Sequence, residues 1–328
     1  RANVNGVMKD LASWPLTPDD TRDIMKKMLS EEKWAEFYKD KELNVAYSLK
    51  NVARFRVNVY FQRGTVASVI RRIRAEVPGF QKLNLPSILG ELIMSRQGLI
   101  LVTGATGSGK STTMAAMIDH RSENFDVHIV TVEDPVEFTF KHKKSLVTQR
   151  EVGMDTHSFK EALRNTLRQA PNVIYIGELR DADTVEFALH SAETGHLVLA
   201  TLHSTNTSQS VERILNFFPH EVHDQILMQL SYNLYSIICQ RLVPAKTGSL
   251  IPALEILINS ALVQEMIQKG ELGKMKKVMD SNRQEGMQSF DAHLKDLVDA
   301  GKVEQDVALK YADSPSDLRL KLRGFESI

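Results

Sequence analysis

The sequence has very little cysteine: Cys239 is the single one among 328 residues. One thiol cannot form an internal disulfide, and it is too few for a cysteine-based zinc site. A chain with this cysteine content suits a reducing cytoplasm. We expect Cys239 to be a buried apolar residue.

Long apolar runs are also lacking. No stretch reaches the roughly 18 apolar residues that a membrane span needs, so we expect no transmembrane segment. The sequence begins at Arg1 without a signal-peptide pattern, and we expect that further residues precede it. The 42% hydrophobic fraction is ordinary for a folded soluble protein.

Neither sign of charge is in excess. Lys plus Arg and Asp plus Glu both number 41. The chain therefore has no overall positive field that would favour nucleic acid or anionic lipid as its main partner.

The length suits two domains of about 100–200 residues, and the pattern changes along the chain. Residues 1–76 mix helical and extended patterns, with strand-like alternation between 55 and 61, and predict a small α+β domain. Residues 77–86 contain prolines and a glycine among polar residues and predict a linker. An α/β core is predicted over 87–252, and a helical C-terminal subdomain over 253–328.

The pattern of the core is that of a parallel sheet. Compact apolar runs alternate with helix-length segments, and these runs are Leu99–Thr103, His128–Val132, Val173–Ile176 and Leu197–Leu202. Near-continuous apolar strands separated by helices are typical of a sheet covered on both faces. We therefore predict an α/β fold.

A phosphate-binding loop follows the first of these runs. Residues 104–111 read GATGSGKS, which matches the G-x-x-x-x-G-K-[ST] pattern, and a helix-prone segment comes next. Backbone N–H groups of such a loop and the helix N-terminus bind phosphate, Lys110 reaches the β- and γ-phosphates, and Ser111 ligates Mg²⁺. We predict ATP and Mg²⁺ as cofactors. The predicted nucleotide-binding residues are Gly104, Thr106, Gly107, Ser108, Gly109, Lys110, Ser111 and Thr112.

Carboxylates follow the second and third apolar runs. Glu133, Asp134 and Glu137 come after the second, and Glu178 comes after the third, at the edge where α/β sheets bind ligands. ATP hydrolysis needs an acid that orients or activates the attacking water. Gly177 stands where many P-loop enzymes carry the Mg²⁺-holding Asp, which shifts that work onto these acids. A solvated acidic turn or a helix cap is the alternative interpretation.

Histidines bracket the fourth run: His196 precedes it and His203 follows it. A histidine at a strand end is more often structural than functional. An imidazole beside the γ-phosphate can, however, report whether the phosphate is present.

Arginines are concentrated between residues 54 and 74 of the first domain. We expect most of them to form a solvated basic face. At least one is a candidate for stabilising charge on the γ-phosphate across a subunit interface.

These segments, in this order, resemble the secretion-type ATPases that power type II secretion and type IV pili. The matching stretches are GATGSGKSTT for Walker A, VTVEDPVEF for the acidic box, TLRQAPNVIYIGELRD for the atypical Walker B and AETGHLVLATLH for the histidine box. The resemblance covers nearly the whole chain. It implies a RecA-like P-loop ATPase core, a PAS-like N-terminal domain whose last strands include residues 54–63, and helices over 217–244.

The resemblance also implies an ATP hydrolase with particular site residues. Lys110 and Ser111 then bind nucleotide and Mg²⁺, and Glu137 is the water-activating acid. The other implied catalytic residues are Glu178, Glu133, His203, His196 and the trans-acting arginines Arg56 and Arg71, while Glu133, Asp134 and Glu178 are further metal candidates.

Departures from the family pattern favour the retraction branch. Assembly ATPases usually carry a four-cysteine zinc insertion, which this chain cannot build. The principal retraction motor, PilT, carries an AIRNL-like motif where residues 261–267 read ALVQEMI here, and this departure together with the tail 317–323 favours the accessory, PilU-type ATPases. The implied partners are identical chains in a hexamer, a PilT-type ATPase and an inner-membrane pilus platform protein. The implied location is the cytoplasm, with peripheral association at the inner membrane.

Two other functions stay open. A nucleic-acid translocase uses the same ATPase core, but balanced charge and the lack of an aromatic and basic strip argue against it. A nucleotide-binding ring adaptor without turnover is the other, and the presence of Lys110, Glu137 and Glu178 argues against that function.

Overall fold

The computed structural model describes residues 1–4, 7–11, 13–50, 52–74 and 76–324. The last four residues of the predicted helical subdomain, 325–328, lie outside this part. The chain forms two compact units, Arg1–Ala75 and Glu76–Ile328. None of the described helices has the length and apolar content of a bilayer-spanning segment.

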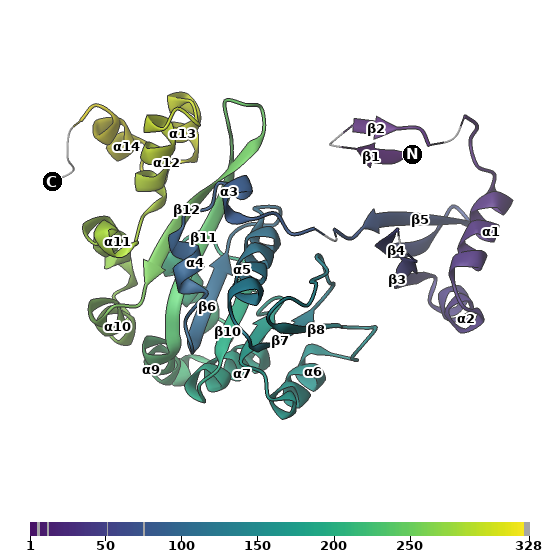
Figure 1. Cartoon of the computed structure of the whole chain (residues 1–328), viewed down its shortest axis with the longest axis horizontal. Helices are drawn as coiled ribbons and strands as arrows, with labels where there is room; N and C mark the ends of the chain where they lie inside the picture. The colour runs from purple at the N-terminus through teal and green to yellow at the C-terminus, as the bar shows by residue number, and fades with distance from the viewer. Residues whose placement is uncertain (5–6, 12, 51, 75, 325–328) are drawn as a thin grey trace. The chain divides into compact units, whose positions relative to one another are not determined.

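The first unit is an α+β unit with two helices and a three-stranded antiparallel sheet of order β3-β4-β5 among its described residues (Figure 1). Its elements are β1 (Ala2–Val4), β2 (Val7–Lys9), α1 (Pro18–Met28), α2 (Glu31–Asp40), β3 (Glu42–Leu49), β4 (Ala53–Gln62) and β5 (Thr65–Arg72). The strand predicted between residues 55 and 61 lies within β4, so that prediction is confirmed.

One face of β4 forms the core of this unit. Val57 is buried, and Phe61 stacks on Phe37 of α2 with ring centroids 4.7 Å apart. Side chains alternate along a strand, so Arg56 points to the other face. There Arg56 lies directly opposite Arg71 of β5 in the strand register.

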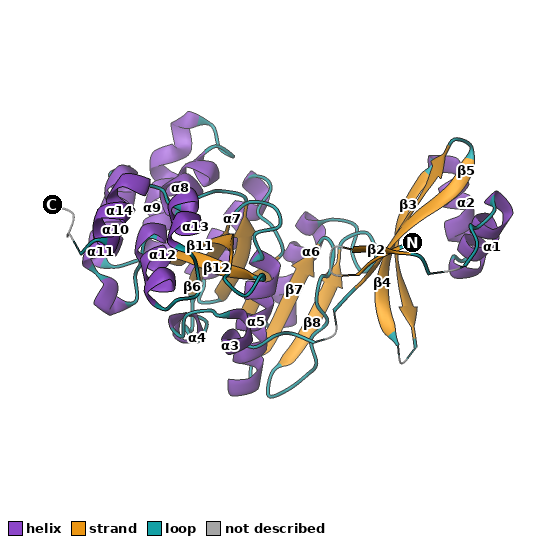
Figure 2. Ribbon diagram, turned by 90° about the horizontal axis from the view of Figure 1, so that it is seen from above, coloured by secondary structure: helices purple, strands orange, loops and turns teal. Residues whose placement is uncertain are grey.

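The second unit is built on a sheet of order β12-β11-β6-β10-β9-β7-β8, in which all neighbours are parallel except β11 and β12 (Figures 1 and 2). The strands are β6 (Gly98–Thr103), β7 (His128–Glu133), β8 (Leu146–Glu151), β9 (Val173–Ile176), β10 (Leu197–Leu202), β11 (Leu234–Pro244) and β12 (Leu250–Ile258). Each apolar run of the predicted core is one of these strands. The predicted α/β fold is confirmed.

Helices cover both faces of this sheet (Figure 1). The core on one face contains α4 (Ile88–Leu92) and α5 (Lys110–Asn124), with α3 (Phe80–Leu83) beside them. The core on the other contains α6 (Phe159–Thr166), α7 (Ala182–Glu193), α8 (Thr207–Leu215) and α9 (His223–Asn233). Along β6, Leu99 and Leu101 pack into the second core, and Ile100 and Val102 pack into the first. This double burial explains why the run is apolar at every position.

Short helices follow the sheet: α10 (Ala261–Gln268), α11 (Met275–Ser281), α12 (Phe290–Asp299), α13 (Gln305–Tyr311) and α14 (Pro315–Leu322). Two expectations differ from the structure here. The helices expected over 217–244 end at α9, and 234–244 is strand β11. Strand β12 also crosses the expected start of the helical subdomain at residue 253. Most residues of both strands are buried, and polar residues such as Ser236, Gln240 and Glu255 lie inside them, so neither strand shows a regular alternation of apolar and polar residues.

Two polar groups are buried where β11 and β12 pair. Cys239 of β11 accepts a hydrogen bond from the Thr103 hydroxyl at 2.9 Å, and burial raises the pKa of its thiol. Glu255 of β12 lies opposite Cys239 and accepts a hydrogen bond from the Thr207 backbone N–H at 2.7 Å, at the start of α8. Burial raises the pKa of Glu255 to about 7. The expected burial of Cys239 is confirmed.

Candidate active site

The phosphate-binding loop connects β6 to α5 and depends on its glycines. Gly104, Gly107 and Gly109 have φ of +150°, +80° and +89°, a region that favours glycine. A Cβ at Gly104 would lie 2.5 Å from both the Gln240 carbonyl oxygen and the Ser108 hydroxyl. The loop therefore folds tightly against β11.

Gln240 of β11 supports this loop with both atoms of its amide. Its Nε2 donates to the Ser108 carbonyl at 2.7 Å, and its Oε1 accepts from the Thr113 hydroxyl at 2.6 Å. Gln240 is buried, so these bonds satisfy polar groups that water does not reach. The loop and the first turn of α5 are thus held to one side chain.

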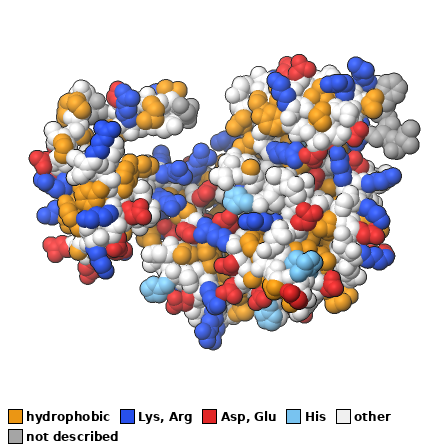
Figure 3. All heavy atoms as spheres, turned by 180° about the vertical axis from the view of Figure 1, so that it is seen from behind, with side chains coloured by type: hydrophobic (Ala, Val, Ile, Leu, Met, Phe, Trp, Pro, Cys, Tyr) orange, Lys and Arg blue, Asp and Glu red, His pale blue; other side chains and the backbone are white. Residues whose placement is uncertain are grey.

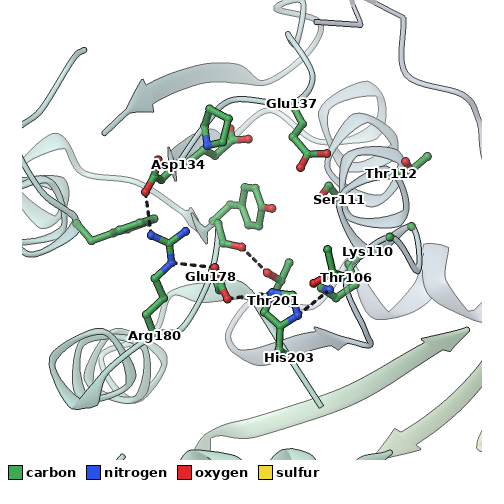
Figure 4. Close-up of a pocket in the computed structure, with 17 residues that line it drawn as sticks. Thr106, Lys110, Ser111, Thr112, Asp134, Glu137, Glu178, Arg180, Thr201 and His203 are labelled. Atoms are coloured by element: carbon green, nitrogen blue, oxygen red, sulfur yellow. Dashed lines mark hydrogen bonds and ion pairs between the residues drawn. The ribbon is translucent and has the colours of Figure 1, made fainter. Parts of the chain in front are cut away.

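A cavity of about 380 Å³ opens beside the loop at the carboxyl ends of β7, β9 and β10 (Figure 4). Such edges are where parallel α/β sheets bind ligands. The predicted site residues that line it are Thr106, Gly107, Gly109, Lys110, Ser111, Thr112, Glu133, Asp134, Glu137, Glu178 and His203.

Lys110 is buried at the floor of this cavity. Its ammonium donates to the carbonyls of Gly104 and Ala105 at 2.8 and 3.0 Å and lies 3.5 Å from Nδ1 of His203. Burial lowers the pKa of Lys110, and the Glu178 and Glu137 carboxylates act in the opposite direction. A desolvated ammonium at the N-terminus of α5 fits a phosphate group.

His203 connects Lys110 to Glu178. Its Nε2 lies 3.0 Å from Oε1 of Glu178. Because an ammonium can only donate, the Lys110 contact makes Nδ1 the acceptor and leaves the proton on Nε2, facing the carboxylate. The loop and the end of β9 are therefore joined through one imidazole.

Glu133 and Glu137 lie in different surroundings. Glu133 is buried and accepts hydrogen bonds from the Thr131 hydroxyl at 2.7 Å and from Nε2 of Gln149 at 3.1 Å. Burial raises the pKa of Glu133 to about 7. Glu137 is exposed, and its carboxylate points toward Ser111 (Figure 4). Of the two, Glu137 has the accessible carboxylate beside the loop.

The glycine at position 177 is explained by its close approach to the backbone of β7. A Cβ there would lie 3.2 Å from Cα of Glu133 and 3.3 Å from the Val132 carbonyl oxygen. Both atoms belong to the backbone of β7, which cannot turn away as a flexible side chain can. An Asp therefore does not fit at this position without moving the neighbouring strand.

Comparison with known proteins gives the family. The model of the family described as "Type II/IV secretion system protein" matches residues 22–289. The chain belongs to this family.

Relatives within the family are named as pilus ATPases. The chain is 45% identical to the type IV pilus ATPase PilU of Pseudomonas aeruginosa, over 99% of this chain and 85% of that protein. It is 36% identical to the retraction ATPase PilT of the same organism, over 96% of this chain and 91% of that protein.

A solved structure of the family agrees in fold. The crystal structure of the pilus retraction motor PilT with bound ADP superposes with a TM-score of 0.90 at 41% identity, covering 97% of this chain and 91% of that one. This likeness confirms the RecA-like ATPase core. The chain is an ATP hydrolase that binds nucleotide.

Some predicted site residues lie elsewhere. His196 is at the opposite end of β10 from His203, and its Nδ1 lies 3.0 Å from a backbone carbonyl of α7. Gly104 and Ser108 line a separate cavity of about 340 Å³ on the β11 side of the loop. Arg56 and Arg71 belong to the first unit. His196 therefore does not line the main cavity.

The main cavity also contains residues that the sequence interpretation missed. Phe159, Tyr175, Arg180 and Thr201 line it, and the Thr201 hydroxyl donates to the carbonyl of Gly177. Arg180 was within reach of prediction, because it stands two residues after Glu178 in the Walker B stretch of this family. Among the residues that the structure describes, no three His, Cys, Asp or Glu side chains are grouped to hold a metal by themselves.

Proposed function

We propose that this chain is a motor subunit that couples ATP hydrolysis to type IV pilus retraction, as the accessory partner of a PilT-type ATPase. The observation that carries the proposal is the convergence of the phosphate loop, the acids and His203 on one cavity, in a chain that resembles PilU over nearly its full length. The absence of a cysteine-based zinc site agrees with a retraction rather than an assembly ATPase.

The loop and Lys110 hold the β- and γ-phosphates in this proposal. Ser111 would hold Mg²⁺ through its hydroxyl oxygen, and the bound ion would neutralise charge on the phosphates. Glu137, whose carboxylate faces Ser111, orients and activates the attacking water (Figure 4).

Glu178 and His203 respond to the γ-phosphate. Lys110 contacts His203 in the structure, so a phosphate that draws the ammonium away changes the partner of Nδ1. His203 passes this change to Glu178 through its Nε2. Glu133 supports the acidic box from its buried position, and Asp134 takes part through its ion pair with Arg180.

A neighbouring subunit completes the site. Arg56 and Arg71 lie side by side across two strands, where like charges repel. An anion between them relieves this repulsion, and the γ-phosphate of an adjacent chain is such an anion. This arrangement requires a neighbouring chain, and a ring of six identical chains is the proposed assembly.

The proposed location is the cytoplasmic face of the inner membrane, in contact with the pilus platform protein. Figure 3 shows Lys and Arg side chains intermixed with Asp and Glu side chains on the face that it draws. Lys plus Arg and Asp plus Glu both number 41, so nucleic acid is not a proposed partner.

The test is ATPase activity measured beside light-scattering mass for the wild type, Lys110→Ala and Glu137→Ala. Each is assayed alone and with a PilT-type partner inactivated at its own P-loop lysine. We expect turnover in a six-chain assembly that both substitutions abolish, and unchanged turnover in the exposed control Glu212→Ala on α8. Nucleotide binding without turnover under either condition would instead support the adaptor.

A further inference from the structure

Arg180 lines the main cavity, and its backbone is held on both sides by hydrogen bonds. It follows β9 and immediately precedes Asp181, which caps α7. The Arg180 backbone N–H donates to the Thr184 hydroxyl at 3.2 Å, and the preceding Leu179 N–H donates to the Thr201 carbonyl at 2.9 Å. The backbone of Arg180 is thus fixed to a helix on one side and to β10 on the other.

The guanidinium of Arg180 holds two acids that come from different strands. Its Nε donates to Oε2 of Glu178 at 2.8 Å, and its Nη1 donates to Oδ2 of Asp134 at 2.8 Å (Figure 4). The Phe159 ring supports the guanidinium, with its centroid 5.5 Å away. Asp134 follows β7 and Glu178 follows β9, and these strands are neighbours in the sheet.

This contact divides the oxygens of Glu178 between two partners. Oε2 accepts from Arg180, while Oε1 faces Nε2 of His203 at 3.0 Å. Rotation of the carboxylate breaks one contact or both. Arg180 thereby selects the orientation in which Glu178 reaches the imidazole beside Lys110.

The orientation of the Glu178 carboxylate matters because the preceding residue, Gly177, has no carboxylate of its own. A side chain at position 177 would press on the backbone of β7, and the strand end lacks the carboxylate that many P-loop enzymes carry there. Glu133, Asp134, Glu137 and Glu178 line the same cavity, and carboxylates gathered at one site repel each other. A planar guanidinium directs two separate nitrogens at two acids, whereas an ammonium offers both acids a single nitrogen on a flexible stem.

We propose that Arg180 is a positioning residue for ATP hydrolysis, which joins Asp134 to Glu178 and fixes the Glu178 carboxylate against His203. The proposal rests on the proposed function, because it assigns Arg180 to the same hydrolytic site. It places Arg180 outside the reacting atoms: Arg180 acts through the acids, and the loop and Lys110 bind the phosphates without it.

The test compares Arg180→Met and Arg180→Lys with the wild type and with Arg283→Met. Arg283 pairs with Asp296 far from the cavity in sequence, and both side chains are about as exposed as that of Arg180, so it is a matched control. We expect kcat to fall about 10- to 100-fold in Arg180→Met, with the KM for ATP within about threefold of wild type and the melting temperature unchanged. Arg283→Met should keep the wild-type kcat.

Arg180→Lys separates geometry from charge. An ammonium can donate to two acids, but only from one nitrogen, so it cannot reproduce the separate Nε and Nη1 positions from which Arg180 reaches Glu178 and Asp134. We therefore expect the kcat of Arg180→Lys to lie within about threefold of that of Arg180→Met. Full activity in Arg180→Lys would mean that positive charge alone is enough, and would overturn the positioning role. A raised KM with a lowered melting temperature in Arg180→Met would overturn it too, since that result describes a loosened fold.

A crystal structure of Arg180→Met gives a second readout, which does not require turnover. We expect the distance between Oε1 of Glu178 and Nε2 of His203, which is 3.0 Å in the wild type, to exceed the hydrogen-bond range in the variant. If that contact survives, Arg180 does not position Glu178, whatever the activity. Failure of the wild type to hydrolyse ATP would refute the proposed function, while this distance would still decide the role of Arg180.

Discussion

Replacing the buried Glu255 by Gln should stabilise the protein at alkaline pH and do little at acid pH. Burial raises the pKa of Glu255 to about 7 from an ordinary 4.5, against the opposing hydrogen bonds from Thr207. The folded state therefore binds a proton that the unfolded state has already released. Gln keeps the oxygen that accepts the Thr207 N–H and never ionises.

The sign and the size follow from linkage. An acid whose pKa is higher in the folded state gives stability that is present below pH 4.5 and is lost as the pH rises through about 7. At about 1.4 kcal/mol for each pKa unit, the cost of ionising Glu255 reaches about 3 kcal/mol above pH 7, and it is about 1 kcal/mol at pH 5. The gain from Glu255→Gln should therefore be about 2 kcal/mol larger at pH 8.5 than at pH 5.

Thermal unfolding at the two pH values measures this difference. A free-energy change of 1 kcal/mol moves the melting temperature of a unit of this size by about 2–4 °C, so we expect an extra increase of roughly 4–8 °C at pH 8.5. Any cost of burying the amide is the same at both pH values and cancels. Glu212→Gln, an exposed change on α8, is the control. An equal effect of Glu255→Gln at both pH values would refute the reasoning.

Two further changes test the close packing of Gly177 against β7 and the support that Gln240 gives to the phosphate loop. Gly177→Asp forces a Cβ to within 3.2 Å of the Glu133 backbone and should destabilise the fold by about 1–3 kcal/mol while lowering kcat; an unchanged melting temperature with full ATPase activity would contradict the crowding argument. Gln240→Leu removes two hydrogen bonds to the loop, each contributing about 1 kcal/mol, and should weaken the binding of fluorescent ADP about 10-fold. An unchanged Kd would show that the loop keeps its shape without Gln240.

The sequence predicted the inner strands of the sheet well and the outer ones poorly. β6, β9 and β10 are buried on both faces, and each appears as a short apolar run between helical segments. Strand β8 lies at the edge of the sheet and mixes polar with apolar residues, so no run marks it. β11 contains Ser236, Gln240 and Arg241 between its apolar residues and shows no regular alternation, so the helix that the family resemblance implied there was not corrected by the sequence pattern.

Some residues of the candidate site could be predicted from the sequence, and others could not. The loop and the acids were predictable because each motif is contiguous or directly follows a strand. Gln240 was not, because it reaches the carbonyl of Ser108 from 132 positions away. Arg180 was visible in the Walker B stretch, but its link to Asp134 depends on the pairing of β7 with β9. Contacts between distant segments require the fold itself.

The buried thiol of Cys239 makes the protein convenient for site-directed labelling. The side chain is fully enclosed and its raised pKa keeps it in the unreactive thiol form. A cysteine introduced on an exposed strand of the first unit, or on α9 of the second, would therefore be the one that reacts with a maleimide or a spin label. Pairs of such labels would measure the separation of the two units with and without ATP while the native cysteine is left in place.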